Sequence, residues 1–128
     1  MPRRRSPTLT DAELRLMEIL WEKGTATVND VVDALPEKQA LAYSTVLTTL
    51  RILEQKGYLG HEMKGRAFVY HPVVDRNQAS RTAVNYIVSR FFDNSPELLV
   101  LNMLENDKID PVELERLKKL VEESPEED

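Results

Sequence analysis

Hydroxyl-bearing and basic side chains recur on one side of the segment from residue 43 to 56. At about 100° per residue, Ser44, Thr48 and Arg51 fall within an arc of about 60°, opposite the apolar positions. Hydroxyl and guanidinium groups donate hydrogen bonds to phosphates and base edges, and a threonine methyl packs on a thymine methyl. The face predicts contact with double-stranded DNA, and a solvated helix face is the alternative. The candidate DNA-binding residues here are Tyr43, Ser44, Thr45, Thr48 and Arg51.

Two further groups of cations lie outside this segment. Lys64 and Arg66 flank Gly65 in a glycine turn, where two cations can straddle a phosphate. Cations that protect a hairpin edge from aggregation are the alternative. A basic arm near the N-terminus could enter a minor groove, or it could be a simple disordered tail. The arm consists of Arg3, Arg4 and Arg5.

Capping signals divide the first part of the chain into three helices. Thr10 and Glu13 form a capping-box pair, which predicts a helix that ends at Gly24. Thr27 is the N-cap candidate of a second helix, which a proline terminates. The third helix is the segment 43–56 itself, and the glycine that follows it suits the C′ position.

The pattern changes over residues 58–74 to two strand-like runs around a glycine turn, which predicts a β-hairpin. A loop of two residues and one of three both fit, so the faces of the strands stay unassigned. Three short helices followed by a hairpin is the order of a winged helix, whose third helix enters the major groove. We therefore expect a mainly α fold with a small β-hairpin wing, and a winged-helix DNA-binding domain over residues 1–74.

Residues 75–128 predict three more helices and an acidic tail. A long helix begins at Asp75, and Ser95 with Pro96 and Asp110 with Pro111 mark two further helix starts. These helices carry more apolar surface than one chain can readily bury, which predicts a helical dimerisation domain of a homodimer. A compact intramolecular subdomain is the alternative. The candidate dimerisation residues are Tyr86, Ile87, Phe91, Leu98, Leu101, Leu104, Leu114 and Leu117.

The charge of the chain is divided unevenly. The 128 residues include 17 Lys and Arg against 22 Asp and Glu, a net charge of -5, which excludes a wholly basic coating for nucleic acid. Residues 1–74 hold ten basic and nine acidic side chains, whereas residues 75–128 hold seven and thirteen. The first part can therefore meet a polyanion, which would repel the second part.

The sequence contains few residues that could form a catalytic or cofactor site. The chain has no Cys and two histidines, His61 and His71, both on the expected hairpin, and its glycines form no phosphate-cradling motif. Surface histidines are favoured over a metal site formed with Glu62 or Asp75. We expect no enzyme, no metal and no cofactor. Without an apolar span of about 18 residues or a signal-peptide core, we expect a cytoplasmic protein and no membrane partner.

Three stretches carry a resemblance that covers the chain from about residue 9 to 121. They are residues 14–21 (LRLMEILW), 43–59 (from YSTV to LEQKGYL) and 95–99 (SPELL). Together they resemble the penicillinase-repressor family, which includes the β-lactamase, methicillin-resistance and copper-responsive repressors. The resemblance implies a homodimeric bacterial repressor of transcription on a palindromic promoter operator. It also implies base reading by Ser44, Thr45, Thr48 and Arg51.

The resemblance also implies a route of inactivation. Antibiotic-resistance repressors of the family are cleaved at an Asn-Phe bond inside a Leu-rich helix, and the matching position here is Asn102-Met103, with Met in place of Phe. Cleavage there by an inactivating protease is therefore a hypothesis. The copper-responsive members carry a C-terminal cysteine cluster, and the lack of Cys excludes copper sensing by that mechanism.

Two functions of different classes follow. The first is a sequence-specific DNA-binding repressor, and the second is a winged-helix protein-interaction module that does not bind DNA. Binding through several phosphates weakens steeply with salt, whereas a mostly apolar docking surface does not respond in this way. An enzymatic function ranks last.

Overall fold

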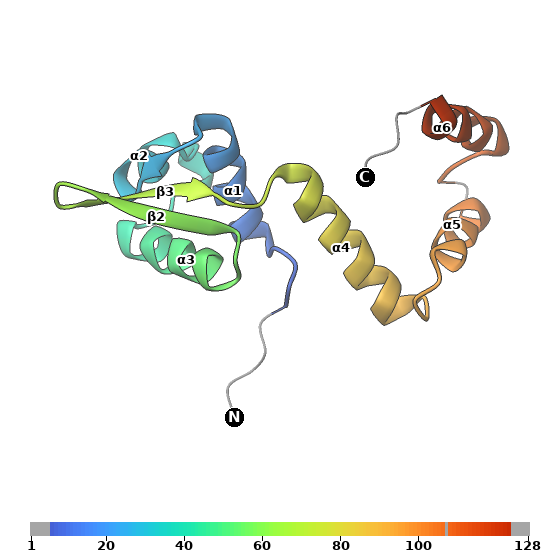
Figure 1. The fold of residues 1–128 in the computed structure, drawn as a ribbon, viewed down its shortest axis with the longest axis horizontal. Helices are drawn as coiled ribbons and strands as arrows, with labels where there is room; N and C mark the ends of the chain where they lie inside the picture. The colour runs from blue at the N-terminus through green and yellow to red at the C-terminus, as the bar shows by residue number, and fades with distance from the viewer. Residues whose placement is uncertain (1–5, 107, 124–128) are drawn as a thin grey trace. The chain divides into compact units, whose positions relative to one another are not determined.

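A computed structural model describes residues 6–106 and 108–123 (Figure 1). The chain packs into two compact units, one up to Tyr86 and the other from Ile87 onward. The helix Arg76–Phe91 therefore contributes to both units. The boundary expected at residue 75 lies one residue before this helix begins. None of the described helices is long and apolar enough to cross a membrane.

The elements follow the predicted order, with two additions. The first unit contains α1 (Asp11–Lys23), β1 (Ala26–Thr27), α2 (Val28–Ala34), a 3-10 helix (Glu37–Gln39), α3 (Tyr43–Gln55), β2 (Leu59–Lys64) and β3 (Ala67–Pro72). The helix α4 (Arg76–Phe91) leads into the second unit, which continues with α5 (Pro96–Glu105) and α6 (Pro111–Glu123). The two elements that the sequence analysis did not predict are the short strand β1 and the 3-10 helix.

Local capping sets the starts of α1 and α2, as predicted. The Thr10 side chain accepts from the Glu13 N–H at 3.1 Å, and the Glu13 carboxylate accepts from the Thr10 N–H at 2.8 Å. Thr27 and Asp30 repeat this capping box at the start of α2. Gly24 ends α1 with a φ of 83°, a conformation that an L side chain adopts with strain. Each of the two capping boxes satisfies an N–H group that a helix leaves unpaired in its first turn.

The three strands form an antiparallel sheet in the order β1-β3-β2. Lys64 pairs with Ala67, so the hairpin loop has two residues, which settles the alternative that the sequence left open. The first loop residue, Gly65, has a φ of 63°, as a glycine in the first central position of a type II′ turn does. Ala26 and Thr27 of β1 pair with Tyr70 and Val69 on the other edge of β3. The predicted winged helix is thus formed, with the hairpin as its wing.

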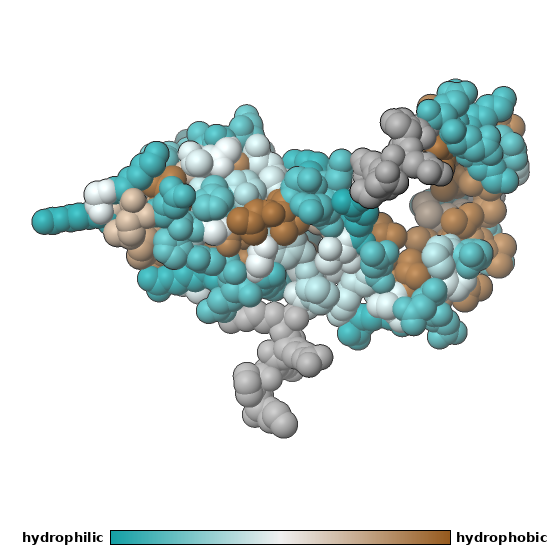
Figure 2. Space-filling model, in the orientation of Figure 1, coloured by the Kyte–Doolittle hydropathy of each residue, from teal (hydrophilic) through white to brown (hydrophobic). Residues whose placement is uncertain are grey.

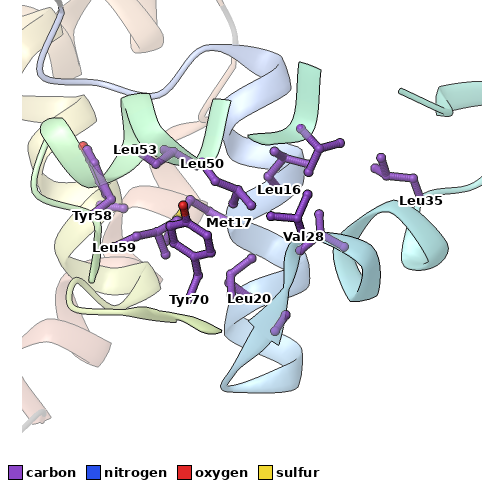
Figure 3. Close-up of a cluster of buried hydrophobic side chains, with 14 residues drawn as sticks. Leu16, Met17, Leu20, Val28, Leu35, Leu50, Leu53, Tyr58, Leu59 and Tyr70 are labelled. Atoms are coloured by element: carbon purple, nitrogen blue, oxygen red, sulfur yellow. The ribbon is translucent and has the colours of Figure 1, made fainter. Parts of the chain in front are cut away.

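The core of the first unit lies between α1, α2, α3 and the sheet. Figure 3 shows Leu50 of α3, Met17 of α1 and Tyr70 of β3 converging there. Eight large side chains are less than 2% exposed: Tyr70, Leu16, Met17, Leu20, Leu50, Leu53, Val31 and Val46. Because three of these lie along one side of α3, the opposite, polar side of that helix must face solvent.

The second unit buries little within one chain. Among the described residues from Ile87 onward, Val88 is the one buried hydrophobic side chain. Large apolar side chains such as Phe91, Val112 and Val121 are more than 70% exposed. Apolar residues accordingly show at the surface of the C-terminal helices (Figure 2).

Candidate nucleic-acid interface

The polar side of α3 is exposed because the apolar side anchors the helix. Val46, Leu50 and Leu53 are fully buried. The side chains at positions 43, 44, 45, 48 and 51 are exposed, and Tyr43 remains 50% accessible. The structure thereby brings the five predicted residues of α3 to the surface: Tyr43, Ser44, Thr45, Thr48 and Arg51.

The start of α3 also offers backbone donors. Ala42 is its N-cap residue and provides no side-chain hydrogen bond, and the first turn contains no acidic residue. The N–H groups of a first helical turn have no acceptor within the helix. Together with the helix dipole, they favour a negatively charged group at this end. A DNA phosphate is one such group.

A cleft of about 220 Å³ lies between α3, the start of α2 and the wing. It brings Arg51 of α3 and Arg66 of the hairpin loop to one place, although they are distant in the sequence. Its lining contains no acidic residue: Thr27, Val28, Asn29, Tyr43, Leu47, Arg51, Arg66, Ala67 and Phe68. Lys64 is exposed in the last rung of the hairpin and does not line the cleft. The cleft is therefore basic and accessible to an anion.

The wing is joined to α3 by a hydrogen-bonded pair, His61 and Glu54, that the sequence analysis did not predict. The Nδ1 atom of His61 lies 2.8 Å and 2.7 Å from the two carboxylate oxygens of Glu54. His61 is opposite Tyr70 in the hairpin, and its ring makes an edge contact with Phe68 at 4.9 Å between centroids. Only the register of the hairpin, which the sequence left open, places His61 on the side of α3.

The other histidine lies on the opposite side of the hairpin. His71 pairs with Gly60, and a Cβ at Gly60 would come within 2.9 Å of the His71 Nε2 atom. Because adjacent strand residues point to opposite faces, His61 and His71 do not come together. No group of three or more potential metal ligands occurs in the part of the chain that the structure describes.

Tyr70 links the core to this charged surface. Burial raises the pKa of its hydroxyl above the ordinary value of 10.0, and Glu54 raises this pKa further, while Arg51 lowers it. The hydroxyl therefore lies within the electrostatic reach of both charges of α3.

The side chains of Arg51, Lys64 and Arg66 form no ion pair with any other described residue.

A buried ion pair holds the opposite end of α3. Lys56 donates to Glu13 at 2.8 Å and to the Thr8 carbonyl at 2.9 Å, and both charged side chains are 7% exposed. The Tyr58 hydroxyl donates to the Pro7 carbonyl. The segment before α1 is thus fixed against the C-terminal end of α3. The predicted arm of Arg3, Arg4 and Arg5 precedes this segment and lies outside the described residues.

The predicted dimerisation residues lie on α4, α5 and α6 and are accessible to different degrees. Phe91 is 73% exposed, Leu101 49% and Leu117 46%, while Tyr86, Leu104 and Leu114 are half-buried. A groove of about 530 Å³ runs along α5, and its lining is Pro96, Glu97, Val100, Leu101 and Leu104. Asn102 is exposed and Met103 half-buried within the same helix.

Comparisons with known proteins extend over both units. A family model described as penicillinase repressor matches residues 9–123. The penicillinase repressor of Bacillus licheniformis is 32% identical over 117 residues, which cover 91% of this chain and 91% of that protein. The methicillin resistance regulatory protein MecI of Staphylococcus aureus (strain N315) is 21% identical over 113 residues, covering 88% and 92%.

A solved structure matches the first unit. The solution structure of the DNA-binding domain of the repressor BlaI shares 33% sequence identity at a TM-score of 0.51, and the match covers 59% of this chain and 93% of that one. This likeness agrees with the winged helix described above. Because the family model extends from the start of the winged helix to the end of α6, this protein belongs to the penicillinase repressor family.

Proposed function

We propose that this protein is a DNA-binding repressor of transcription that occupies a palindromic promoter operator as a homodimer. The observation that carries the proposal is the basic cleft that Arg51 of α3 and Arg66 of the wing both line. The family assignment and the likeness to the DNA-binding domain of BlaI support it. This activity belongs in the cytoplasm, and it requires no catalytic residue.

Each exposed group of the first unit has a role in this proposal. Helix α3 enters the major groove, where Ser44, Thr45 and Thr48 contact base edges and thymine methyl groups. The first-turn amides of α3 and the cations Lys64 and Arg66 bind phosphates, and these contacts fix the orientation of the protein on the duplex. The basic arm enters the adjacent minor groove.

The second unit supplies the two-fold symmetry. One winged helix covers a half-site, and two identical units related by a dyad match a palindrome. The exposed apolar residues of α5 and α6 are covered in such a homodimer. The acidic charge of this unit keeps it away from the phosphates, so that only the winged helices approach DNA.

Release from the operator follows if a protease cuts the bond between Asn102 and Met103. This bond lies within α5, and cutting it would separate α6 from the rest of the dimerisation surface. Incubation with the cognate protease should yield a fragment that ends at Asn102, which mass spectrometry detects. An uncleaved chain under conditions that relieve repression would remove this part of the proposal.

Fluorescence anisotropy tests the DNA-binding function directly. The purified protein is titrated with a duplex from upstream of its own gene and with a scrambled duplex, each at two salt concentrations. We expect specific, salt-sensitive binding with two chains per duplex. Failure to bind either duplex at low salt would favour the protein-interaction module instead.

The variant Arg51→Ala distinguishes a base contact of Arg51 from a phosphate contact. Loss of a base contact should cost about 1–3 kcal/mol of discrimination between the two duplexes. An equal loss on both duplexes would make Arg51 a phosphate contact. Arg116→Ala on α6 is the matched control, because it removes the same charge from an exposed position of the second unit.

A further inference from the structure

Helix α3 contains one acidic side chain, Glu54, and one basic side chain, Arg51. Residues three apart on a helix are neighbours, and an acid and a base at this spacing can pair. Such a pair would neutralise a cation that the proposed function needs at the cleft. The structure shows a different arrangement, in which both carboxylate oxygens of Glu54 are within 2.8 Å of the His61 Nδ1 atom.

His61 is well placed to hold this carboxylate. It lies in β2 opposite Tyr70, and its ring contacts Phe68 at 4.9 Å and Tyr70 at 5.8 Å between centroids. These ring contacts restrict the imidazole, so that Nδ1 faces α3. The pair is about one third exposed on each side, which leaves the interaction only partly screened by solvent.

We propose that His61 is a positioning residue of the DNA-binding surface, which holds the Glu54 carboxylate at the wing and so leaves Arg51 unpaired for DNA. The inference rests on the proposed function and adds a residue that makes no DNA contact itself. Without His61, the Glu54 side chain is free to turn toward Arg51. It then competes with DNA for that cation and brings a negative charge closer to the phosphates.

Four proteins test the proposal: the wild type, His61→Phe, Glu54→Gln and the double variant. Phenylalanine retains a ring against Phe68 and Tyr70 but removes the Nδ1 atom. We expect His61→Phe to weaken operator binding about three- to tenfold and to lower the salt slope by about one, the loss of one charged contact. Glu54→Gln alone should stay within about twofold of the wild type, because it removes the competing charge.

The double variant separates charge control from a purely structural role. If Glu54 competes for Arg51, adding Glu54→Gln to His61→Phe should restore affinity and salt slope to within about twofold of the wild type. If the pair merely anchors the wing, the double variant binds no better than His61→Phe, and the proposal is overturned. Both proteins carry the same phenylalanine, so a folding defect common to them does not affect this comparison.

Two further outcomes complete the test. In an Arg51→Ala background, His61→Phe should have no additional effect, because the contested cation is gone. His61→Phe binding as tightly as the wild type would overturn the proposal. A wild type that does not distinguish operator from scrambled duplex would instead contradict the proposed function, so the two failures are distinguishable.

Discussion

The two units differ in what they bury, although both consist largely of amphipathic helices. The first packs fourteen buried side chains into one core, whereas the described part of the second buries only Val88 among its hydrophobic residues. Apolar periodicity alone therefore does not tell whether a helix packs within its own chain. The first unit has a core of its own, and the second exposes the apolar surface that the proposed homodimer would cover.

The ion pairs of the two units differ in the same way. Lys56 and Glu13 are 2.8 Å apart and 7% exposed, whereas Lys118 and Glu115 are 3.8 Å apart and more than 60% exposed. A buried charge that loses its partner remains unsolvated, but an exposed one is solvated by water. The loss of a lysine should therefore have unequal consequences in the two units.

Lys56→Met should produce the largest effect. It leaves Glu13 buried without its cation and should lower the free energy of unfolding by about 3–5 kcal/mol. Urea unfolding followed by the fluorescence of Trp21, the single tryptophan, reports on the first unit. Lys118→Met is the control and should change the stability by about 0.5 kcal/mol or less. A similar small change for both variants would contradict the difference between the units.

Leu101→Asp should act on assembly instead of folding. A charge in the exposed groove of α5 should separate the homodimer and weaken operator binding about a hundredfold, since the two half-sites are then bound independently. Sedimentation measures the mass, and the Trp21 unfolding curve should not move. Asn102→Asp adds the same charge at the next position and should leave the mass unchanged. A wild type that sediments as a monomer would rule out this account of the second unit.

Local chemistry explains which parts of the fold were predictable. The caps at Thr10, Thr27 and Ser95 each depend on residues within three positions, and all three are present. The strand β1 is two residues long and exists only because β3 offers its free edge, so no local signal marks it. The hairpin register likewise depends on a turn for which two lengths fitted the sequence.

The candidate site likewise has a part that local sequence predicts and a part that depends on contacts between distant residues. The exposed side of α3 follows from helical periodicity, because the buried positions determine the opposite side. The presence of Arg51 and Arg66 in one cleft, and the hydrogen bond between Glu54 and His61, require the hairpin to lie on α3 in one register. Both arrangements bring together residues from different elements, and spacing along the chain does not encode them.

Gly57→Ala tests how much stability the first unit loses when a side chain must adopt a positive φ. Gly57 has a φ of 88°, and no atom lies within 4 Å of the position that a Cβ would take, so the cost comes from the backbone conformation alone. Alanine should lower the stability of the first unit by about 1–2 kcal/mol. In the second unit Asn94 holds a φ of 59°, which shows the tolerance of asparagine for this region. Gly57→Asn should therefore lose clearly less stability than Gly57→Ala in the same Trp21 assay.

Asp30→Asn should give the smallest effect, a loss of stability that is present at neutral pH and disappears in acid. The hydrogen bond from the Thr27 backbone N–H, and then the Thr27 side chain, lower the pKa of Asp30 below its ordinary value of 3.8. A lowered folded pKa means that the stabilisation is complete above the unfolded value and is lost as the pH falls through the folded one. Asparagine cannot ionise, so this part of the acid dependence should disappear from Trp21 unfolding curves.

Glu97→Gln is the control in the second unit. It removes a carboxyl whose pKa is also lowered, first by a hydrogen bond to its own backbone and then by Ser95. We expect its Trp21 curves to match the wild type at every pH, because Trp21 lies in the first unit and Glu97 in the second. A shift equal to that of Asp30→Asn would show that the two units unfold together.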